Sequence, residues 1–168
     1  MRRKVLQLLV DNTSGVLSRI SGLFSRRGYN IESITAGVTA DPRYTRITIV
    51  TSGDDEILEQ IEKQVAKLED VRDVKTLEPE NSVYRELALI KVRCAPEQRQ
   101  EIITIADTDN FRAKIIDVCK EALIVELTGN QDKIDTFIGL LENYEILELA
   151  RTGIAGLGRG IENVTYLP

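Results

Sequence analysis

The sequence predicts an α+β fold made of two ferredoxin-like βαββαβ units, each a four-stranded antiparallel sheet with two helices on one face. Apolar and alternating runs typical of strands are interspersed with segments of helical spacing, and this order of elements occurs twice in 168 residues. A polar stretch containing Pro79 separates the two copies. We therefore expect an N-terminal domain at residues 1–78, a linker at 79–84, and a C-terminal domain at 85–168 that ends in a glycine-rich tail.

The first unit begins with an apolar run from Lys4 to Val10, which predicts a strand. Thr13 to Gly15 predict a helix start with a hydroxyl as cap, and Gly28 is typical of a helix end. Two β-branched segments around a turn at Pro42 predict a hairpin with strands at residues 29–38 and 44–52.

The first unit closes with a helix and a strand. Gly53-Asp54-Asp55 predicts the helix start, and the strand is expected at residues 71–77. The apolar stripe of the helix is Ile57, Leu58, Ile61, Val65 and Leu68.

The second unit repeats this order. Pro96 lies near a helix start, and Asn130 is a candidate cap for the last helix. The expected strands are residues 86–94, 111–118, 123–128 and 146–151. Each unit is close to the size at which a core alone is marginal, and each sheet has one face without helices. We therefore expect at least a homodimer, in which sheets or their edges pair between subunits.

Composition excludes several classes of function. The chain has no histidine, which removes the usual general base and the commonest metal ligand. A net charge of −5 argues against nucleic acid as the main partner. No apolar run approaches a membrane span, and no signal peptide follows the basic start, so we expect a cytoplasmic protein. The two cysteines, Cys94 and Cys119, are expected to be small buried hydrophobic residues.

The loop from Asp11 to Leu17 is the clearest candidate site. A helix N-terminus presents unpaired N–H groups that favour a carboxylate, and Gly15 lets a ligand approach the backbone. Asn12 offers a donor and an acceptor, while Asp11 supplies negative charge for an ammonium group. With the apolar residues Val16 and Leu17 these groups match an amino acid, although a simple capped turn has the same pattern.

Several stretches also carry a family resemblance. They are residues 12–19, 22–33, 58–64, 85–87, 111–118 and 150–153. On these residues the chain resembles the small, regulatory subunit of acetolactate synthase (acetohydroxyacid synthase). The resemblance covers nearly the whole chain, and residues 26–33 are its most specific part.

The resemblance implies an N-terminal ACT domain that senses an amino acid at a dimer interface. Valine, and often isoleucine or leucine, is the implied feedback inhibitor. One chain would supply Asn12, Gly15, Val16 and Leu17. The other would supply Asn30 and Ile31, with Ile34 as a possible wall, although ordinary strand core explains Ile31 and Ile34 equally well.

The resemblance also implies a partner and its chemistry. The partner is the catalytic large subunit, which would hold thiamine diphosphate, magnesium and FAD and make acetolactate from pyruvate. This chain would bind none of these cofactors and would not be a catalyst; it would raise the partner's activity and confer valine sensitivity. The alternatives are an amino-acid-responsive transcription regulator, an enzyme using carboxylates or lysine, and an assembly scaffold without a ligand.

Two further motifs carry no site in this interpretation. The glycines from Gly153 to Gly160 follow a strand, precede no helix and lack a phosphate-binding register, so we expect a flexible tail. Helix-start charge and turn chemistry explain the acidic clusters at residues 54–56 and 107–109 at least as well as a metal does.

Overall fold

The structure is a computed structural model that describes residues 1–161 and Val164. The chain forms two compact units. The first contains Met1–Tyr84 together with the tail from Ile154 onward, and the second contains Arg85–Gly153. Both are βαββαβ units with an antiparallel sheet, as the sequence predicts.

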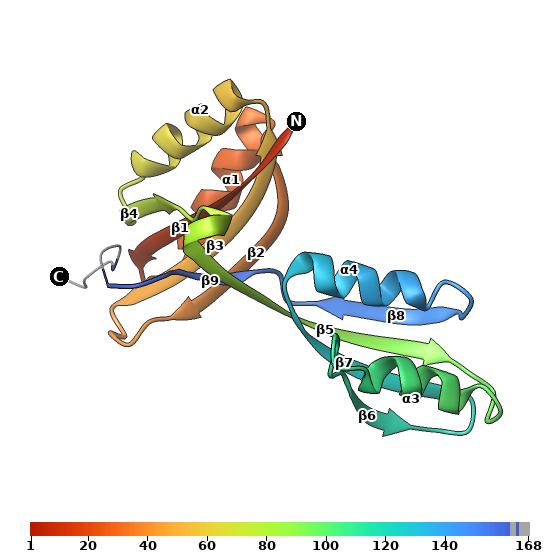
Figure 1. The fold of residues 1–168 in the computed structure, drawn as a ribbon. Coiled ribbons are helices and arrows are strands. Elements are labelled where there is room, and N and C mark those ends of the chain that lie inside the picture. Colours follow the sequence, from red (N-terminus) through yellow and green to blue (C-terminus); the bar gives the residue numbers. More distant parts are fainter. Residues whose placement is uncertain (162–163, 165–168) are drawn as a thin grey trace. The chain divides into compact units, whose positions relative to one another are not determined.

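The first unit has a four-stranded sheet of order β2-β3-β1-β4 with two helices on one face (Figure 1). Its elements are β1 (Arg2–Asp11), α1 (Val16–Arg27), β2 (Asn30–Val38), β3 (Tyr44–Gly53), α2 (Asp55–Ala66) and β4 (Val71–Thr76). The core lies between helices and sheet, and its largest fully buried side chains are Leu6, Leu8, Ile20, Phe24, Ile47, Ile49 and Ile61. Strand β2 is an edge strand, which matters for the site described below.

The start of α2 agrees with its sequence pattern, with one exception. Asp54 is the N-cap, and its side chain accepts a hydrogen bond from the backbone N–H of Ile57 at 2.9 Å. Leu58, Ile61 and Val65 are buried. Ile57 was expected in the same apolar stripe, but its side chain is exposed. It precedes Leu58 by one residue, so it lies about 100° around the helix from the buried Leu58.

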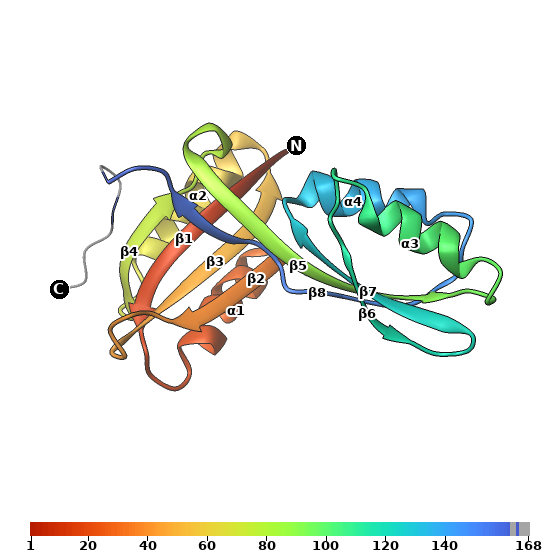
Figure 2. The same cartoon turned by 60° about the horizontal axis from the view of Figure 1, so that its bottom comes forward.

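The helix-free face of the first sheet is partly covered by the chain itself. Val5 and Val50 on that face are buried in a cluster with Leu77 and Ile154, against which Tyr84 packs. The covering segments are the 3-10 turn Pro79–Asn81, the first residues of β5 (Ser82–Arg93) and β9 (Ala155–Gly158), which pairs with β5 (Figure 2).

Two predictions about these segments are therefore corrected. The expected linker at residues 79–84 contains a 3-10 turn and the start of a strand. The glycine-rich tail was assigned to the C-terminal domain and expected to be flexible, but its described part includes a strand and belongs to the first unit. The apolar side chain of Ile154 anchors it there, since Ile154 is buried. The remainder of the predicted tail lies outside the described residues.

The second unit repeats the architecture with strand order β6-β7-β5-β8. Besides β5 its elements are α3 (Arg99–Asp107), β6 (Lys114–Val118), β7 (Ala122–Gly129), α4 (Gln131–Leu140) and β8 (Ile146–Arg151). Asn130 caps α4 as predicted, since its side chain accepts from the backbone N–H of Lys133 at 2.9 Å. No helix among the described residues is long and apolar enough to cross a membrane.

Two sequence predictions fail in the second unit. Phe111 was expected to begin a strand, but it lies in the turn before β6 and packs edge-to-face on Phe137, with ring centroids 5.2 Å apart. Cys94 is buried as expected, whereas Cys119 is exposed. The reason is that Cys119 lies beyond the end of β6, in the turn to β7, where its backbone N–H bonds to Ala122 O.

Candidate functional site

The predicted ligand loop follows β1 directly and leads into α1. Asp11, the last residue of β1, does not offer a free negative charge. Its carboxylate accepts two hydrogen bonds from Arg72, at 2.8 and 2.9 Å, and its backbone N–H bonds to Asp70 O at 2.9 Å. The expectation that Asp11 pairs with a ligand ammonium is therefore not supported by its contacts, because Arg72 already neutralises it.

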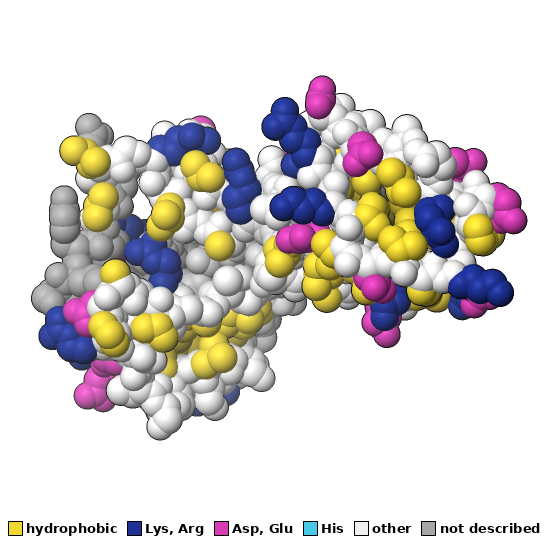
Figure 3. Space-filling view, turned by 90° about the horizontal axis from the view of Figure 1, so that it is seen from below, with side chains coloured by type: hydrophobic (Ala, Val, Ile, Leu, Met, Phe, Trp, Pro, Cys, Tyr) yellow, Lys and Arg dark blue, Asp and Glu magenta, His cyan; other side chains and the backbone are white. Residues whose placement is uncertain are grey.

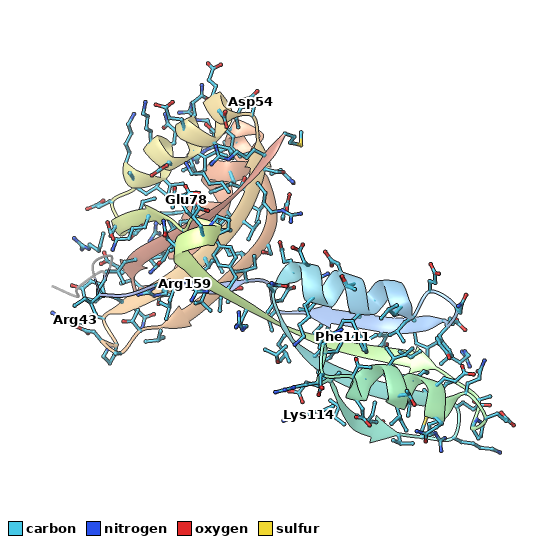
Figure 4. The ribbon with its side chains drawn as sticks, viewed as in Figure 1. Arg43, Asp54, Glu78, Phe111, Lys114 and Arg159 are labelled. Carbon is cyan, nitrogen blue, oxygen red and sulfur yellow. The ribbon has the colours of Figure 1, made fainter. Side chains whose placement is uncertain are left out.

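Asn12 fixes the loop to the β2–β3 hairpin. Its backbone N–H bonds to Arg43 O and its side-chain Nδ2 to Pro42 O, both at 2.8 Å. Its Oδ1 accepts from Thr45 Oγ1 at 3.1 Å. Figure 4 labels Arg43 at the tip of this hairpin. Asn12 thus holds two neighbouring turns together, a positioning role that the sequence did not indicate.

Gly15 forms the N-cap of α1 in a left-handed conformation, with φ of 84° and ψ of −7°. The expected hydroxyl cap is absent: within the described chain, no side chain caps this helix. Glycine occupies the cap because its backbone takes the positive φ without a steric penalty. The first turn therefore keeps its N–H groups available for an anion, together with the positive end of the helix dipole.

A cation lies directly beside this turn. A Cβ built on Gly15 would be 2.8 Å from Nη1 of Arg19. Arg19 is itself held by Asp70, with Nε to Oδ2 at 2.5 Å and Nη2 to Oδ1 at 3.1 Å. This pairing lowers the pKa of Asp70 and raises that of Arg19. Arg19 and Asp70 were not among the predicted site residues. The one-turn spacing of Gly15 and Arg19 is a signal that could have found Arg19, whereas Asp70 lies 51 positions further along the chain and gives no local signal.

The two apolar residues after Gly15 point in different directions. Val16 is 4% exposed and belongs to the core of the first unit, so only its backbone faces the loop. Leu17 is 49% exposed and stands free beside the helix start. A ligand at this turn would therefore meet the side chain of Leu17 but not that of Val16.

The residues predicted from β2 lie at the other end of the sheet. Asn30 is aligned with Ser52 and Arg3, whereas the loop follows Asp11, which is aligned with Tyr44. These positions are eight residue steps apart along β1, a distance of about 27 Å at 3.4 Å per residue. One chain therefore brings Asn12, Gly15 and Leu17 together but does not bring Asn30 to them.

The side chains of β2 divide between solvent and core. Asn30 is exposed, and its Nδ2 donates to Ser52 Oγ at 3.5 Å. Ile31 and Ile34 are half-buried and pack against the core, as the alternative interpretation of these residues expected. Val38, at the end of β2 nearest the loop, is exposed and apolar. It was not singled out in the sequence, where it looks like any strand residue.

The remaining surface offers no competing chemical centre within the described chain. No group of three or more Cys, Asp and Glu side chains there is arranged to hold a metal. Two open grooves of about 480 and 460 Å³ lie between α2 and β4 and between α3 and α4. Neither groove is lined by a predicted site residue among the described residues.

Comparison with known families accounts for both units. A family described as an AHAS small subunit-like ACT domain matches residues 6–73, and one described as the small subunit of acetolactate synthase matches residues 85–160. A probable acetolactate synthase small subunit from Methanothermobacter thermautotrophicus is 50% identical over 157 residues, which is 93% of this chain and 92% of that protein. The isozyme 3 small subunit from Salmonella typhimurium is 46% identical over 94% of this chain and 96% of its own length.

A solved structure agrees with the sequence comparisons. The crystal structure of an acetolactate synthase small subunit from Thermotoga maritima superimposes with a TM-score of 0.86 at 45% identity. The match covers 96% of this chain and 99% of that chain, so both units and their connection are shared.

Proposed function

Because this chain belongs to the acetolactate synthase small-subunit family, we propose that it activates the catalytic subunit and makes it sensitive to feedback inhibition by valine. The site observation that carries the proposal is the uncapped start of α1, where Gly15 leaves N–H groups and dipole available to a carboxylate. Leu17, exposed beside it, suits the side chain of a branched-chain amino acid.

A second copy of the chain would complete the site. Strand β2 is an edge strand of nine residues, from Asn30 to Val38. If two copies pair antiparallel along β2, Asn30 of one chain comes beside Val38 of the other, at the end of the sheet that carries the loop. The separation of Asn30 and Gly15 within one chain supports this arrangement, because a family site that uses both then requires two chains.

The contacts of Asn30 and Asp11 indicate which group would hold the ligand ammonium. Asp11 is already paired with Arg72. Asn30 donates from Nδ2 to Ser52, and its Oδ1 accepts no hydrogen bond from any residue that the structure describes. We assign the ammonium to Oδ1 of Asn30 from the second chain, and the carboxylate to the first turn of α1. Selectivity among valine, leucine and isoleucine would be modest, because one methylene contributes about 1–3 kcal/mol.

The catalytic partner would bring the cofactors. Thiamine diphosphate, magnesium and FAD belong to it in this proposal, and it would supply the bond-making chemistry between pyruvate molecules. The present chain would contribute binding of the effector and a change in the partner's activity, in the cytoplasm. Effector coupling of about 1–3 kcal/mol would alter affinity or activity by roughly 5–150-fold. The first unit would sense the effector, and residues from Arg85 onward would contribute to the contact with the partner.

Reconstitution tests the proposal directly. The full chain is added to a catalytic large subunit, and acetolactate formation is followed with and without valine. We expect the wild-type chain to raise the rate and valine to lower it again. Asn12→Ala and Asn30→Ala should still activate but lose the response to valine, while Gln60→Ala, at an exposed position of α2 outside the site, should behave as wild type. No activation by the wild-type chain would refute the regulatory role.

A thermal measurement separates binding from coupling. Because a ligand that binds only the folded state stabilises it, valine should raise the melting temperature of the wild-type chain with increasing concentration. The rise should disappear in both site variants. A rise that persists in both would place the binding site elsewhere.

A further inference from the structure

Strand β6 is a free edge of the second sheet, and its surface is unusually apolar for such an edge. In the order β6-β7-β5-β8 it has a neighbour on one side only (Figure 1). It is five residues long, and Ile116 and Val118 are 50% and 51% exposed. On the side seen in Figure 3, apolar side chains of this unit gather among charged ones. Unpaired edges invite pairing with another strand, so proteins protect them with charge or cover them.

A bulge in β6 puts its two charges on one face. Lys114 pairs in register with Glu126, and Asp117 with Ile124, with a register shift between Ile115 and Asp117. Because Glu126 and Ile124 are two residues apart, Lys114 and Asp117 face the same side of the sheet. That side is opposite the buried Leu123 and Val125, so it is the helix-free face. The two charges lie about 7 Å apart along the strand, with Ile116 between them.

Neither charge is used inside the chain. Among the described residues, neither Lys114 nor Asp117 forms an ion pair. By contrast, β5 and β8 of the same sheet are joined by the ion pairs Lys91–Glu148 and Glu86–Arg151. Figure 4 labels Lys114 at the start of β6. A lysine alone on an edge strand usually keeps it from pairing. Here the lysine is matched by an acid on the same strand, and the pattern is its own complement under a two-fold rotation.

We propose that two copies of this chain associate through their β6 strands, paired antiparallel about a two-fold axis at the Ile115–Ile116 bulge. Lys114 of each chain then lies opposite Asp117 of the other, which gives two equivalent ion pairs. Ile116 packs against the same residue of the second chain across the axis. This interface lies in the second unit, and it goes beyond the proposed function because it does not use the effector site.

Each feature has a separate role in this interface. Exposed ion pairs contribute little affinity, so the charges set the register rather than the strength. Burial of Ile116 and Val118 and the new backbone hydrogen bonds supply the favourable free energy. A different protein would have to carry the same acid–base spacing in reverse order, whereas a second copy carries it by symmetry.

Disulfide trapping tests the register. In full-length chains with Cys119→Ser, one chain carries Lys114→Cys and the other Asp117→Cys. Cβ atoms of directly opposed residues lie about 5 Å apart, within reach of a disulfide. Oxidation of the co-expressed pair should therefore produce a species of twice the chain mass on a non-reducing gel. Each variant alone should give little of it, because position 114 lies about 8 Å from position 114 of the second chain.

The control is a pair that is out of register. Lys114→Cys co-expressed with Lys120→Cys, another exposed lysine, should not form the disulfide. A failure of the 114–117 pair to cross-link, or equal yields from the 114–120 pair, would overturn the proposal.

Charge reversal gives an independent readout. In a chain with Ile116→Cys, either Lys114→Glu or Asp117→Lys should lower the yield of the 116–116 disulfide at least about threefold, and the two reversals together should restore it. Equal losses in the single and double variants would also contradict it.

Discussion

Gly15 is glycine because its backbone takes a positive φ, and a side chain at this position would also displace the end of the Arg19 side chain. Alanine would have to adopt φ of 84°, and its Cβ would meet Nη1 of Arg19 at 2.8 Å. We expect Gly15→Ala to lower the free energy of unfolding by about 1–2 kcal/mol and to abolish the response to valine. Gly22→Ala is the matched control in the same helix. A Cβ at position 22 meets nothing within 4 Å, so this substitution should stabilise the folded protein slightly. Denaturant titration of both variants measures the difference; equal stability changes would contradict this account.

The Arg19–Asp70 pair predicts a dependence of stability on acid. The hydrogen bond from Arg19 lowers the pKa of Asp70 in the folded state. A carboxyl whose folded pKa is depressed stabilises the protein above its unfolded pKa, about 3.9 for aspartate, and this contribution is lost as pH falls through the folded pKa. We therefore expect Arg19→Gln to reduce stability at pH 7 and to have a smaller effect near pH 2. Thermal unfolding at both pH values tests this, and an unchanged difference would exclude the pair as its cause.

Glu86 is a buried carboxylate whose charge is balanced by one arginine, Arg151. It is 4% exposed and accepts from Arg151 Nε at 2.7 Å and Nη2 at 3.1 Å, while Nη1 of Arg151 bonds to Asp135 at 2.7 Å. Removing the arginine leaves a buried charge without its partner, so Arg151→Met should cost about 3 kcal/mol. Adding Glu86→Gln to that variant should recover part of the loss. If the double variant is as unstable as the sum of the singles, the two residues are not coupled.

At the scale of elements, β9 depends on a close contact that a side chain would disrupt. A Cβ on Gly156 would lie 2.9 Å from Leu77 Cδ1 and 3.1 Å from Tyr84 Cδ1, inside the cluster that covers Val5 and Val50. Gly156→Val should displace β9 and lower stability by about 1–3 kcal/mol, as overpacking does. Hydrogen exchange of residues 154–158 should speed up. Leu157→Ala, at an exposed position of the same strand, should leave hydrogen exchange unchanged. If both substitutions change exchange equally, the contact of Gly156 with Leu77 and Tyr84 does not hold β9 in place.

The elements that periodicity specifies were predicted closely. Strand β8 begins and ends at the predicted residues, and Asp54 and Asn130 cap their helices as expected. The start of β5 and the strand β9 were not predicted. A four-residue strand with two glycines has no alternation to detect, and its pairing partner β5 ends more than sixty residues earlier in the sequence. Such strands are specified by the surface they cover, which local sequence does not describe.

The candidate site was predicted less completely than the fold. The loop and its glycine follow from the pattern before a helix, and the structure shows the helix start there. Hydroxyls at Thr13 and Ser14 suggested a side-chain cap, but the glycine backbone takes that position instead. The pairing of Asp11 with Arg72 joins residues 61 positions apart, so the loss of its free charge could not be read from the loop. Local sequence indicates where a site begins, whereas long-range pairs decide which charges remain available.

At the scale of the whole molecule, the second unit is an insertion into the first. The chain leaves the first unit after Tyr84 and returns to it at Ile154. The first of these two points lies in β5 and the second lies just before β9. The start of β5 and the whole of β9 cover the helix-free face of the first sheet. Loss of the tail should therefore destabilise the first unit, although its βαββαβ core is complete by Thr76. A chain ending at Gly153 should melt at a lower temperature than the full chain, and an unchanged melting temperature would show that the tail adds no stability.

The proposed effector site requires two chains, and mixed dimers test that requirement. In a dimer of an Asn12→Ala chain and an Asn30→Ala chain, one site combines both substitutions and the other combines two native residues. If each site takes its loop from one chain and Asn30 from the other, this mixed dimer keeps one intact site. It should then bind about half the valine of the wild-type dimer with native affinity, whereas either variant alone binds none. If both residues came from the same chain, no site would be intact and the mixed dimer would not bind. Isothermal titration calorimetry of mixed dimers isolated with two different tags separates these outcomes, because the stoichiometry distinguishes the two arrangements independently of affinity.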